Sequence, residues 1–190
     1  MNKLAKKIRT ITISPAIAFL LILFIFIFKN SFLANTYSYI IALTTLIILP
    51  IIAYPIQKKF NIIKNPDQRY AERNLAIIFS VIGYLIGFIL SLILKTPITE
   101  KVLYSTYLLS AILIFVFSFI FKINASGHMA GIAGPIAVVI YYFSNYYLLL
   151  CLLLIPIIWS SLKLKRHSHQ ELVLGTFIPI IALIISILIF

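Results

Sequence analysis

The sequence predicts an all-α fold, a polytopic membrane helix bundle with about seven transmembrane helices. Hydrophobic residues make up 63% of the 190 residues and charged residues 11%, whereas a soluble domain has about 25% charged residues. Seven stretches approach the roughly 20 apolar residues that a membrane-spanning helix needs. None of them contains an internal charge. A chain this apolar is expected to reside in lipid.

The seven predicted spans tile the chain and are bounded by polar gaps. They cover residues 11–28, 37–56, 74–94, 102–121, 129–143, 146–162 and 172–190. The first is interpreted as a retained span and not as a signal peptide, because its 18 apolar residues exceed a usual signal core and no small-residue cleavage pattern follows. Since no Gly-, Ser- or Pro-rich stretch divides the chain, residues 1–190 are predicted to form a single membrane-embedded domain.

The net charge of +12 is concentrated on one face of this arrangement. Seven spans place the N-terminus and the gaps after spans two, four and six together, and the other gaps and the C-terminus opposite. The first face holds 13 of the 16 basic residues: Lys3, Lys6, Lys7, Arg9, Lys58, Lys59, Lys64, Arg69, Arg73, Lys122, Lys163, Lys165 and Arg166. The second holds Lys29, Lys95 and Lys101. The positive-inside rule therefore predicts a multi-pass cell-membrane protein with a cytoplasmic N-terminus and a cytoplasmic basic face.

The positions of these charges, in short gaps beside spans, suit topology signals and contacts with lipid headgroups better than a nucleic-acid interface. Cys151 is the one cysteine and lies in an apolar run, which leaves no disulfide framework or thiolate metal site. No metal or cofactor is expected. The three gaps on the basic face hold all three histidines and three of the four acidic residues. Any chemistry is therefore expected there.

The gap before the third span reads Asn65-Pro66-Asp67-Gln68-Arg69-Tyr70-Ala71-Glu72-Arg73. It resembles a helix start with Asn65 as the cap and Pro66 in the first turn. Arg69 and Arg73, four residues apart, would share one face and could bind a phosphate through paired hydrogen bonds. Alternatively, the two arginines only mark the cytoplasmic end of a span.

The gap before the fifth span ends in Ser126-Gly127-His128, at the entry to a helix. Free amides at a helix N-terminus point toward an anion, and His128 would lie beside it. The alternative is a serine cap followed by an interfacial histidine.

The gap before the seventh span contains His167 and Glu171 at helical spacing. A carboxylate at that offset can hold one ring nitrogen and leave the other free to attack phosphorus. Ser168 and Glu171 equally fit a capping box that does not involve His167. His169 is the weaker candidate for the reactive imidazole, because Val173 stands four residues after it and cannot orient a ring.

These three segments, in this order, resemble the type 2 phosphatidic acid phosphatase superfamily, and in particular a small archaeal and bacterial branch of it. The second motif of the superfamily is close to Pro-Ser-Gly-His, and the chain has Ala125-Ser126-Gly127-His128. The third motif is Ser-Arg, five residues, His, three residues and Asp, usually with a later glycine. His167, Glu171 and Gly175 match its tail.

The first and third motifs are divergent. The third-motif arginine would stand at Ser161, and Lys165, one helical turn on, is a candidate substitute. The first motif is Lys, six residues, Arg-Pro. Arg73 fits its arginine, but Asn74 replaces the proline and Pro66 occupies the lysine position, with Lys64 and Arg69 as nearby candidates.

The resemblance implies a metal-independent membrane lipid phosphatase, a hydrolase that acts through a phosphohistidine. The substrate would be a phosphate or diphosphate monoester of a lipid such as an isoprenoid, phosphatidate-like or glycerophospholipid phosphate. His167 would attack phosphorus, Glu171 would orient it, and His128, protonated near neutral pH, would protonate the leaving alkoxide. Charge would be stabilised by Arg69, Arg73, Lys165 and the amides of Ser126 and Gly127.

Two other functions fit the same sequence. A catalytically inactive relative would bind a lipid phosphate or scaffold membrane partners, and Ser161 favours this reading. A transporter is disfavoured, because the predicted spans contain no ionisable Asp, Glu, Lys, Arg or His to mark an ion path.

Overall fold

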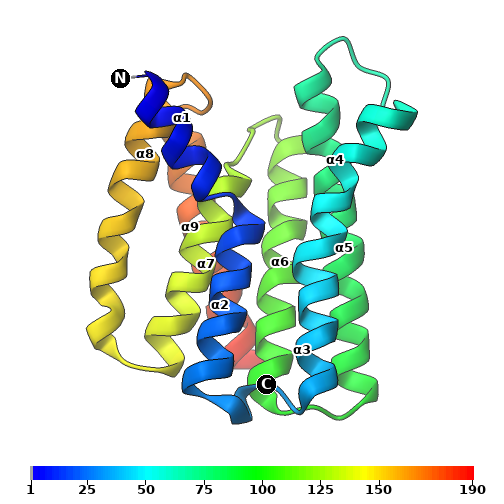
Figure 1. The fold of residues 1–190 in the computed structure, drawn as a ribbon, viewed down its shortest axis with the longest axis vertical. Helices are drawn as coiled ribbons and strands as arrows, with labels where there is room; N and C mark the ends of the chain where they lie inside the picture. The colour runs from blue at the N-terminus through cyan, green and yellow to red at the C-terminus, as the bar shows by residue number, and fades with distance from the viewer. Residues whose placement is uncertain (1) are drawn as a thin grey trace.

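The structure is a computed structural model that describes residues 2–190, and within them it is all-helical, without a strand. The helices run up and down between two ends of the molecule (Figure 1). In chain order they are α1 (Asn2–Ile11), α2 (Ser14–Phe28), η1 (Asn30–Phe32), α3 (Thr36–Leu43), η2 (Thr44–Ile48), α4 (Leu49–Phe60), α5 (Gln68–Ile93), α6 (Ile98–Phe119), α7 (Gly127–Tyr142), η3 (Asn145–Leu153), α8 (Leu154–Lys163) and α9 (His169–Ile189).

Five helices are long and apolar enough to cross a membrane, and six if the bent pair α1–α2 counts as one span. The five are Thr36–Phe60, Gln68–Ile93, Ile98–Phe119, Asn145–Lys163 and His169–Ile189. The all-helical membrane fold is thus supported, but the predicted count of seven is not confirmed. α7 has 16 residues and extends about 24 Å at 1.5 Å per residue, which is shorter than a typical hydrocarbon core.

The first predicted span, residues 11–28, begins later than expected. The helix is interrupted at Thr12 and Ile13, and α1 and α2 meet at a bend of 46°. Pro15 lies in the first turn of α2, where its missing N–H and fixed φ are tolerated. The residues before it form α1, a basic helix that packs against α8 and that the hydropathy pattern alone did not predict.

Side-chain caps set the starts of the helices near the polar gaps. α5 begins at Gln68 with Asp67 as its cap, so the expected cap at Asn65 was wrong. The Asp67 Oδ1 accepts from the amides of Arg69 (3.0 Å) and Tyr70 (3.3 Å), whereas Asn65 Oδ1 accepts from the Asp67 amide in the preceding turn. The Asp67 side chain satisfies two amides at the helix start that would otherwise lack a partner.

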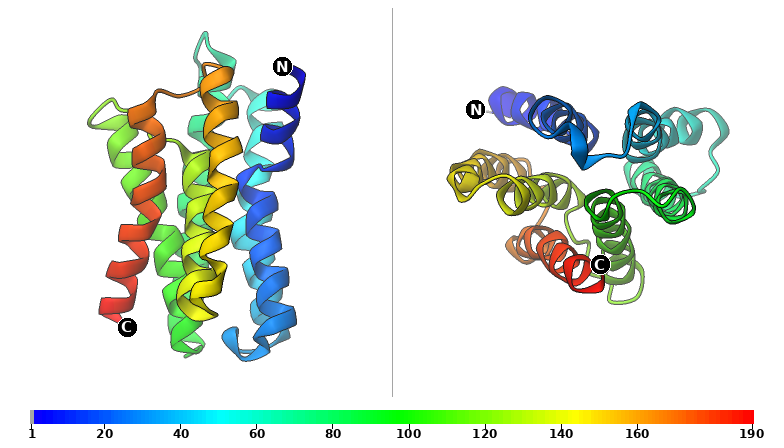
Figure 2. Two further views of the ribbon diagram at one scale, coloured as in Figure 1. Left: turned by 90° about the vertical axis from the view of Figure 1, so that its left-hand side faces the viewer. Right: turned by 90° about the horizontal axis from the view of Figure 1, so that it is seen from below.

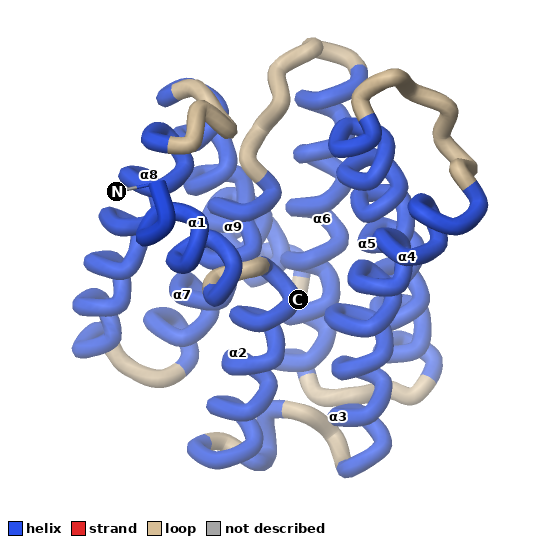
Figure 3. The backbone as a smooth tube through the Cα atoms, turned by 45° about the horizontal axis from the view of Figure 1, so that its top comes forward, coloured by secondary structure: helices blue, strands red, loops and turns tan. Residues whose placement is uncertain are grey.

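The N-terminus and the α4–α5, α6–α7 and α8–α9 loops lie at one end of the molecule, and the C-terminus lies at the other (Figures 1, 2 and 3). The 13 basic residues of the predicted cytoplasmic face therefore gather at the end that carries the three loops. Which end faces the cytoplasm remains a prediction.

The largest buried apolar cluster lies in the half of the bundle away from these loops, around Phe32, Leu46 and Tyr104. Two smaller clusters lie nearer the loops and contain Met129 and Ala130 from the first turns of α7. The first turns of α7 and α9 are thus held by packing, which fixes the positions of the loop residues that precede them.

Candidate functional site

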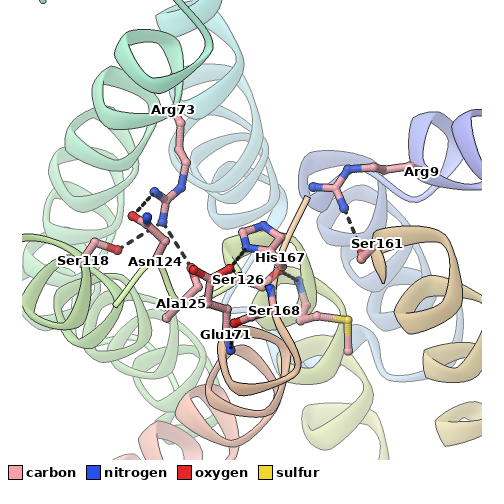
Figure 4. Close-up of polar contacts among 11 residues, drawn as sticks. Arg9, Arg73, Ser118, Asn124, Ala125, Ser126, Ser161, His167, Ser168 and Glu171 are labelled. Atoms are coloured by element: carbon pink, nitrogen blue, oxygen red, sulfur yellow. Dashed lines mark hydrogen bonds and ion pairs between the residues drawn. The ribbon is translucent and has the colours of Figure 1, made fainter. Parts of the chain in front are cut away.

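The side chain of Arg73 connects the start of α5 to the loop between α6 and α7. Its Nη1 donates to Asn124 Oδ1 (2.8 Å), and its Nη2 donates to Ser118 Oγ (3.1 Å) and to the Ala125 carbonyl (3.2 Å) (Figure 4). These contacts run from α5 to the end of α6 and the loop before α7. Arg73 therefore positions the loop that leads into His128.

The loop between α6 and α7 contacts the first turns of α9 through Ser126. The Ser126 amide donates to the Glu171 carbonyl (2.9 Å). A Cβ at Gly175 would overlap the Ser126 carbonyl oxygen and lie 3.0 Å from Ser126 Cβ. Because only a glycine permits this approach, Gly175 sets the spacing between the two histidine-bearing segments.

Glu171 makes both of the contacts that the sequence suggested, since it holds His167 and also completes the capping box of α9. His167 Nδ1 lies 2.9 Å from Glu171 Oε2, and the same oxygen accepts from the Ser168 amide (3.1 Å) while Ser168 Oγ caps the Glu171 amide (3.3 Å). An ionised carboxylate can only accept, so Nδ1 carries the proton and Nε2 presents its lone pair. Within residues 2–190, Nε2 makes no hydrogen bond.

Burial lowers the pKa of His167, and the hydrogen bond and charge of Glu171 oppose that shift. The imidazole is therefore neutral at pH 7. A neutral ring with Nδ1 held and Nε2 free is the form that a nucleophile requires.

The imidazole of His128 is held by Thr12, which lies in the break between α1 and α2. Thr12 Oγ1 donates to the Ile8 carbonyl (2.9 Å) and lies 3.1 Å from His128 Nε2. A hydroxyl has one hydrogen, so both bonds form together only when Nε2–H is the donor to Thr12. Burial, followed by the charges of Arg9 and His167, lowers the pKa of His128 to about 3. The expected protonation of this ring at neutral pH therefore requires an anion to offset the positive charge around it.

A cavity of about 620 Å³ opens between the histidines and continues into the bundle. His128, His167 and the arginines lie at the end nearest the loops. Farther in, the walls are mostly apolar, with hydroxyl groups at greater depth. The lining includes Arg9, Ile13, Pro15, Leu46, Pro50, Arg69, Arg73, Ile77, Tyr84, Thr106, Tyr107, Ala111, Ile114, Gly127, His128, Gly131, Pro135, His167 and Pro179.

Five of the eight site residues proposed from sequence line the cavity, namely Arg69, Arg73, Gly127, His128 and His167. The other three lie outside its lining.

Of those three, Glu171 lies behind His167 and acts through it. Ser126 is fully buried, and its amide and hydroxyl are engaged by Glu171 and Met129, so it is a structural cap without a free amide. Lys165 is exposed, with a left-handed φ of 50° just after α8, which turns the chain toward His167.

Arg9 was missed as a site residue. It lines the cavity, and its Nη1 donates to Ser161 Oγ (2.8 Å) (Figure 4). Sequence reasoning assigned Arg9 to the topology signal because it stands in a basic segment. The signal that could have identified it is the spacing of four from Ala5, which places both residues on one face of an amphipathic helix.

Comparison with protein-family models, with curated proteins and with solved structures finds no match to this chain.

Proposed function

We propose that this chain is a membrane lipid phosphatase that hydrolyses a phosphate or diphosphate monoester through a phosphohistidine. The observation that supports this most directly is that two histidines, each held in a different hydrogen-bonded state, line one cavity. His167 has Nδ1 fixed by Glu171, whereas His128 donates Nε2–H to Thr12 and makes no hydrogen bond at Nδ1 within residues 2–190. Guanidinium groups stand at the same end of the cavity.

In the proposed reaction, the lone pair of His167 Nε2 forms a bond to phosphorus as the bond from phosphorus to the lipid oxygen breaks. The leaving oxygen takes a proton from His128 and departs as the lipid alcohol. Water then attacks phosphorus, His128 accepts its proton, and the phosphorus–nitrogen bond breaks to release inorganic phosphate. Each group thus returns to its starting state.

The protonation of His128 is coupled to substrate in this proposal. In the protein alone, the pKa of about 3 keeps the ring neutral at pH 7. A phosphate dianion beside it favours the charged ring, because an opposite charge within hydrogen-bonding range raises the pKa of an imidazole. Substrate binding would therefore bring a proton to the group that must donate one.

The shape of the cavity supports an amphiphilic substrate. Its charged end can receive a phosphate, and its apolar walls between the helices, such as Leu46, Ala111 and Ile114, can receive a hydrocarbon chain. Buried apolar surface contributes binding energy in proportion to its area. An isoprenoid, phosphatidate-like or glycerophospholipid phosphate would meet both requirements.

Release of inorganic phosphate from a panel of lipid phosphates by the purified protein in detergent tests this proposal. We expect His167→Ala to abolish release and His128→Ala to lower kcat by about a hundredfold or more, the contribution of a general acid. His169→Ala is the matched control, since His169 is exposed at the first position of α9 and lies outside the cavity. Equal loss in all three variants would show that the loop is fragile and would contradict the assigned roles.

The inactive, lipid-phosphate-binding relative is the second candidate, and the engagement of Arg73 favours it. Three hydrogen bonds tie its guanidinium to Ser118, Asn124 and Ala125, which leaves fewer donors for a transition state. Tight binding of a lipid phosphate without phosphate release from any member of the panel would establish this alternative.

A further inference from the structure

α1 brings one basic side chain inward and leaves the others outside. Lys3, Lys6 and Lys7 are exposed, whereas Arg9 is partly buried and Ala5 is fully buried against the bundle. α1 packs on α8 and is bent by 46° from α2, so it crosses the end of the molecule that carries the three loops (Figures 1 and 3). The bend directs Arg9 toward the cavity.

Arg9 has no acidic partner. The one ion pair within residues 2–190 is His167–Glu171, and the charges that act on Arg9 include Arg69 and Arg166, which repel it. A partly buried guanidinium among like charges is unfavourable unless an anion compensates it. One hydrogen bond, to Ser161, uses one of its five N–H donors.

The position of Arg9 fits an anion held by the histidines. Arg9 lines the same cavity as His128 and His167, and its charge acts on both rings. Its Nη1 also donates to Ser161 Oγ on α8, 152 positions away in the sequence. α1 thus places a guanidinium, from far away in the sequence, beside that position.

We propose that Arg9 is an anion-binding residue of this site and that α1, a surface helix, is part of the substrate-binding machinery. This inference rests on the proposed function and goes beyond it. The ligand group is a tetrahedral oxyanion with two negative charges, the phosphate of a lipid monoester. A guanidinium matches such a group with paired, charge-assisted hydrogen bonds.

The competing explanation is that Arg9 only anchors α1 through Ser161, and two substitutions separate the two roles. Arg9→Gln removes the guanidinium. Ser161→Ala removes the anchoring hydrogen bond but keeps the guanidinium on α1. Lys6→Gln is the matched control, because it removes one positive charge from the exposed side of the same helix.

The probe is tungstate, a tetrahedral dianion, titrated calorimetrically into the detergent-solubilised full chain. We expect Arg9→Gln to weaken tungstate binding by about ten- to a hundredfold, the effect of losing a charge-assisted hydrogen bond. Arg9→Lys should fall between it and the wild type, because the charge is kept without the paired geometry. Ser161→Ala should weaken binding less than Arg9→Gln, and Lys6→Gln should match the wild type.

Docking of α1 is followed independently by thiol labelling of Ala5→Cys in a Cys151→Ser background. Ala5 is fully buried, so labelling reports release of α1. We expect Ala5→Cys to stay protected when combined with Arg9→Gln. If Arg9→Gln and Ser161→Ala instead expose this position and weaken tungstate binding equally, Arg9 is an anchor and the inference is overturned.

Two further outcomes distinguish this inference from the proposed function. Unchanged tungstate affinity in Arg9→Gln, with loss in His167→Ala, would overturn the role of Arg9 and leave the phosphatase proposal standing. A wild type that neither binds tungstate nor releases phosphate from lipid phosphates would overturn both.

Discussion

A single carboxylate oxygen serves both the fold and the site at Glu171. Oε2 accepts from the Ser168 amide, which completes the cap of α9, and from His167 Nδ1, which fixes the ring. The cap defines where the helix begins and therefore where the carboxylate stands relative to His167. Local stability and ring orientation are coupled through one atom.

Glu171→Gln and Ser168→Ala should separate these two functions. Glu171→Gln removes the charge that holds Nδ1–H, and we expect kcat for phosphate release to fall on the order of a hundredfold or more. Ser168→Ala removes only the cap and should lower the free energy of unfolding by about 1 kcal/mol, with a smaller effect on kcat. Thermal unfolding and phosphate release of both variants provide the measurements. A larger loss of kcat in Ser168→Ala than in Glu171→Gln would contradict the orienting role.

The pKa of His128 predicts a loss of stability in acid. In the folded protein the pKa is about 3, below its ordinary value of 6.5, because burial disfavours the charged ring. Between these values the unfolded chain binds a proton that the folded chain does not, so stability is complete above about pH 6.5 and declines as the pH falls. We expect Tm to drop from pH 7.5 to pH 5 and to drop less in His128→Gln.

His169→Gln is the control for this measurement, since His169 is exposed. His167 has a lowered pKa as well, so the slope should shrink in His128→Gln without vanishing. Parallel Tm profiles for the wild type and His128→Gln would show that this ring is not buried in its neutral form.

At the residue scale, what the sequence predicted correctly is what depends on neighbours along the chain. The His167–Glu171 pair is separated by one helical turn, and the Ser126 cap precedes its helix directly, so spacing and residue type are sufficient. The contact between Arg9 and Ser161 joins residues 152 positions apart. No local pattern encodes that distance, and Arg9 was indistinguishable from the other basic residues near it.

At the scale of elements, one close approach governs the site: that of α7 to α9. Gly175 on α9 faces the Ser126 carbonyl at the start of α7. Sequence could predict where both helices begin, because their caps are serines. It could not predict the bend between α1 and α2, since hydropathy is insensitive to a break of two residues.

Gly175→Ala should therefore impair activity although alanine favours helix formation. An added methyl would meet backbone at Ser126, which cannot swing away as a flexible side chain can. We expect α9 to shift from α7, with kcat reduced about tenfold to a hundredfold, because small displacements of reacting groups strongly reduce rate. Val173→Ala, at an exposed position two residues earlier, is the control. Full activity in Gly175→Ala would show that the spacing is not critical.

At the scale of the whole molecule, the cavity and the charge asymmetry lie at the same end. The three loops, the N-terminus and most basic residues gather there, opposite the C-terminus (Figures 1 and 2). Sequence predicted this grouping from the alternation of spans and gaps, since each pair of spans returns the chain to the same side. It could not define the cavity, which is lined by residues of α1, α2, η2, α4, α5, α6, α7 and α9.

The side of the membrane that carries the site is the remaining prediction at this scale. Of the basic residues, 13 lie at the end with the loops and three at the other. If the five basic residues of these gaps that could bind an anion (Arg69, Arg73, Lys122, Lys165 and Arg166) are left out of the count, 13 − 5 = 8 remain, still more than three. The loops should therefore face the cytoplasm. A site there would act on lipid phosphates of the inner leaflet.

Labelling of single cysteines with a membrane-impermeant thiol reagent in intact cells tests this orientation. Cys151 is exposed and is first replaced by serine. Lys59→Cys then reports the end with the loops, and Ser31→Cys reports the opposite end; both positions are exposed. We expect labelling at position 31 in intact cells and at position 59 only after permeabilisation. The reverse pattern would place the histidines outside the cell. The site would then act on lipid phosphates of the outer leaflet, and the charge asymmetry would reflect anion binding instead of topology.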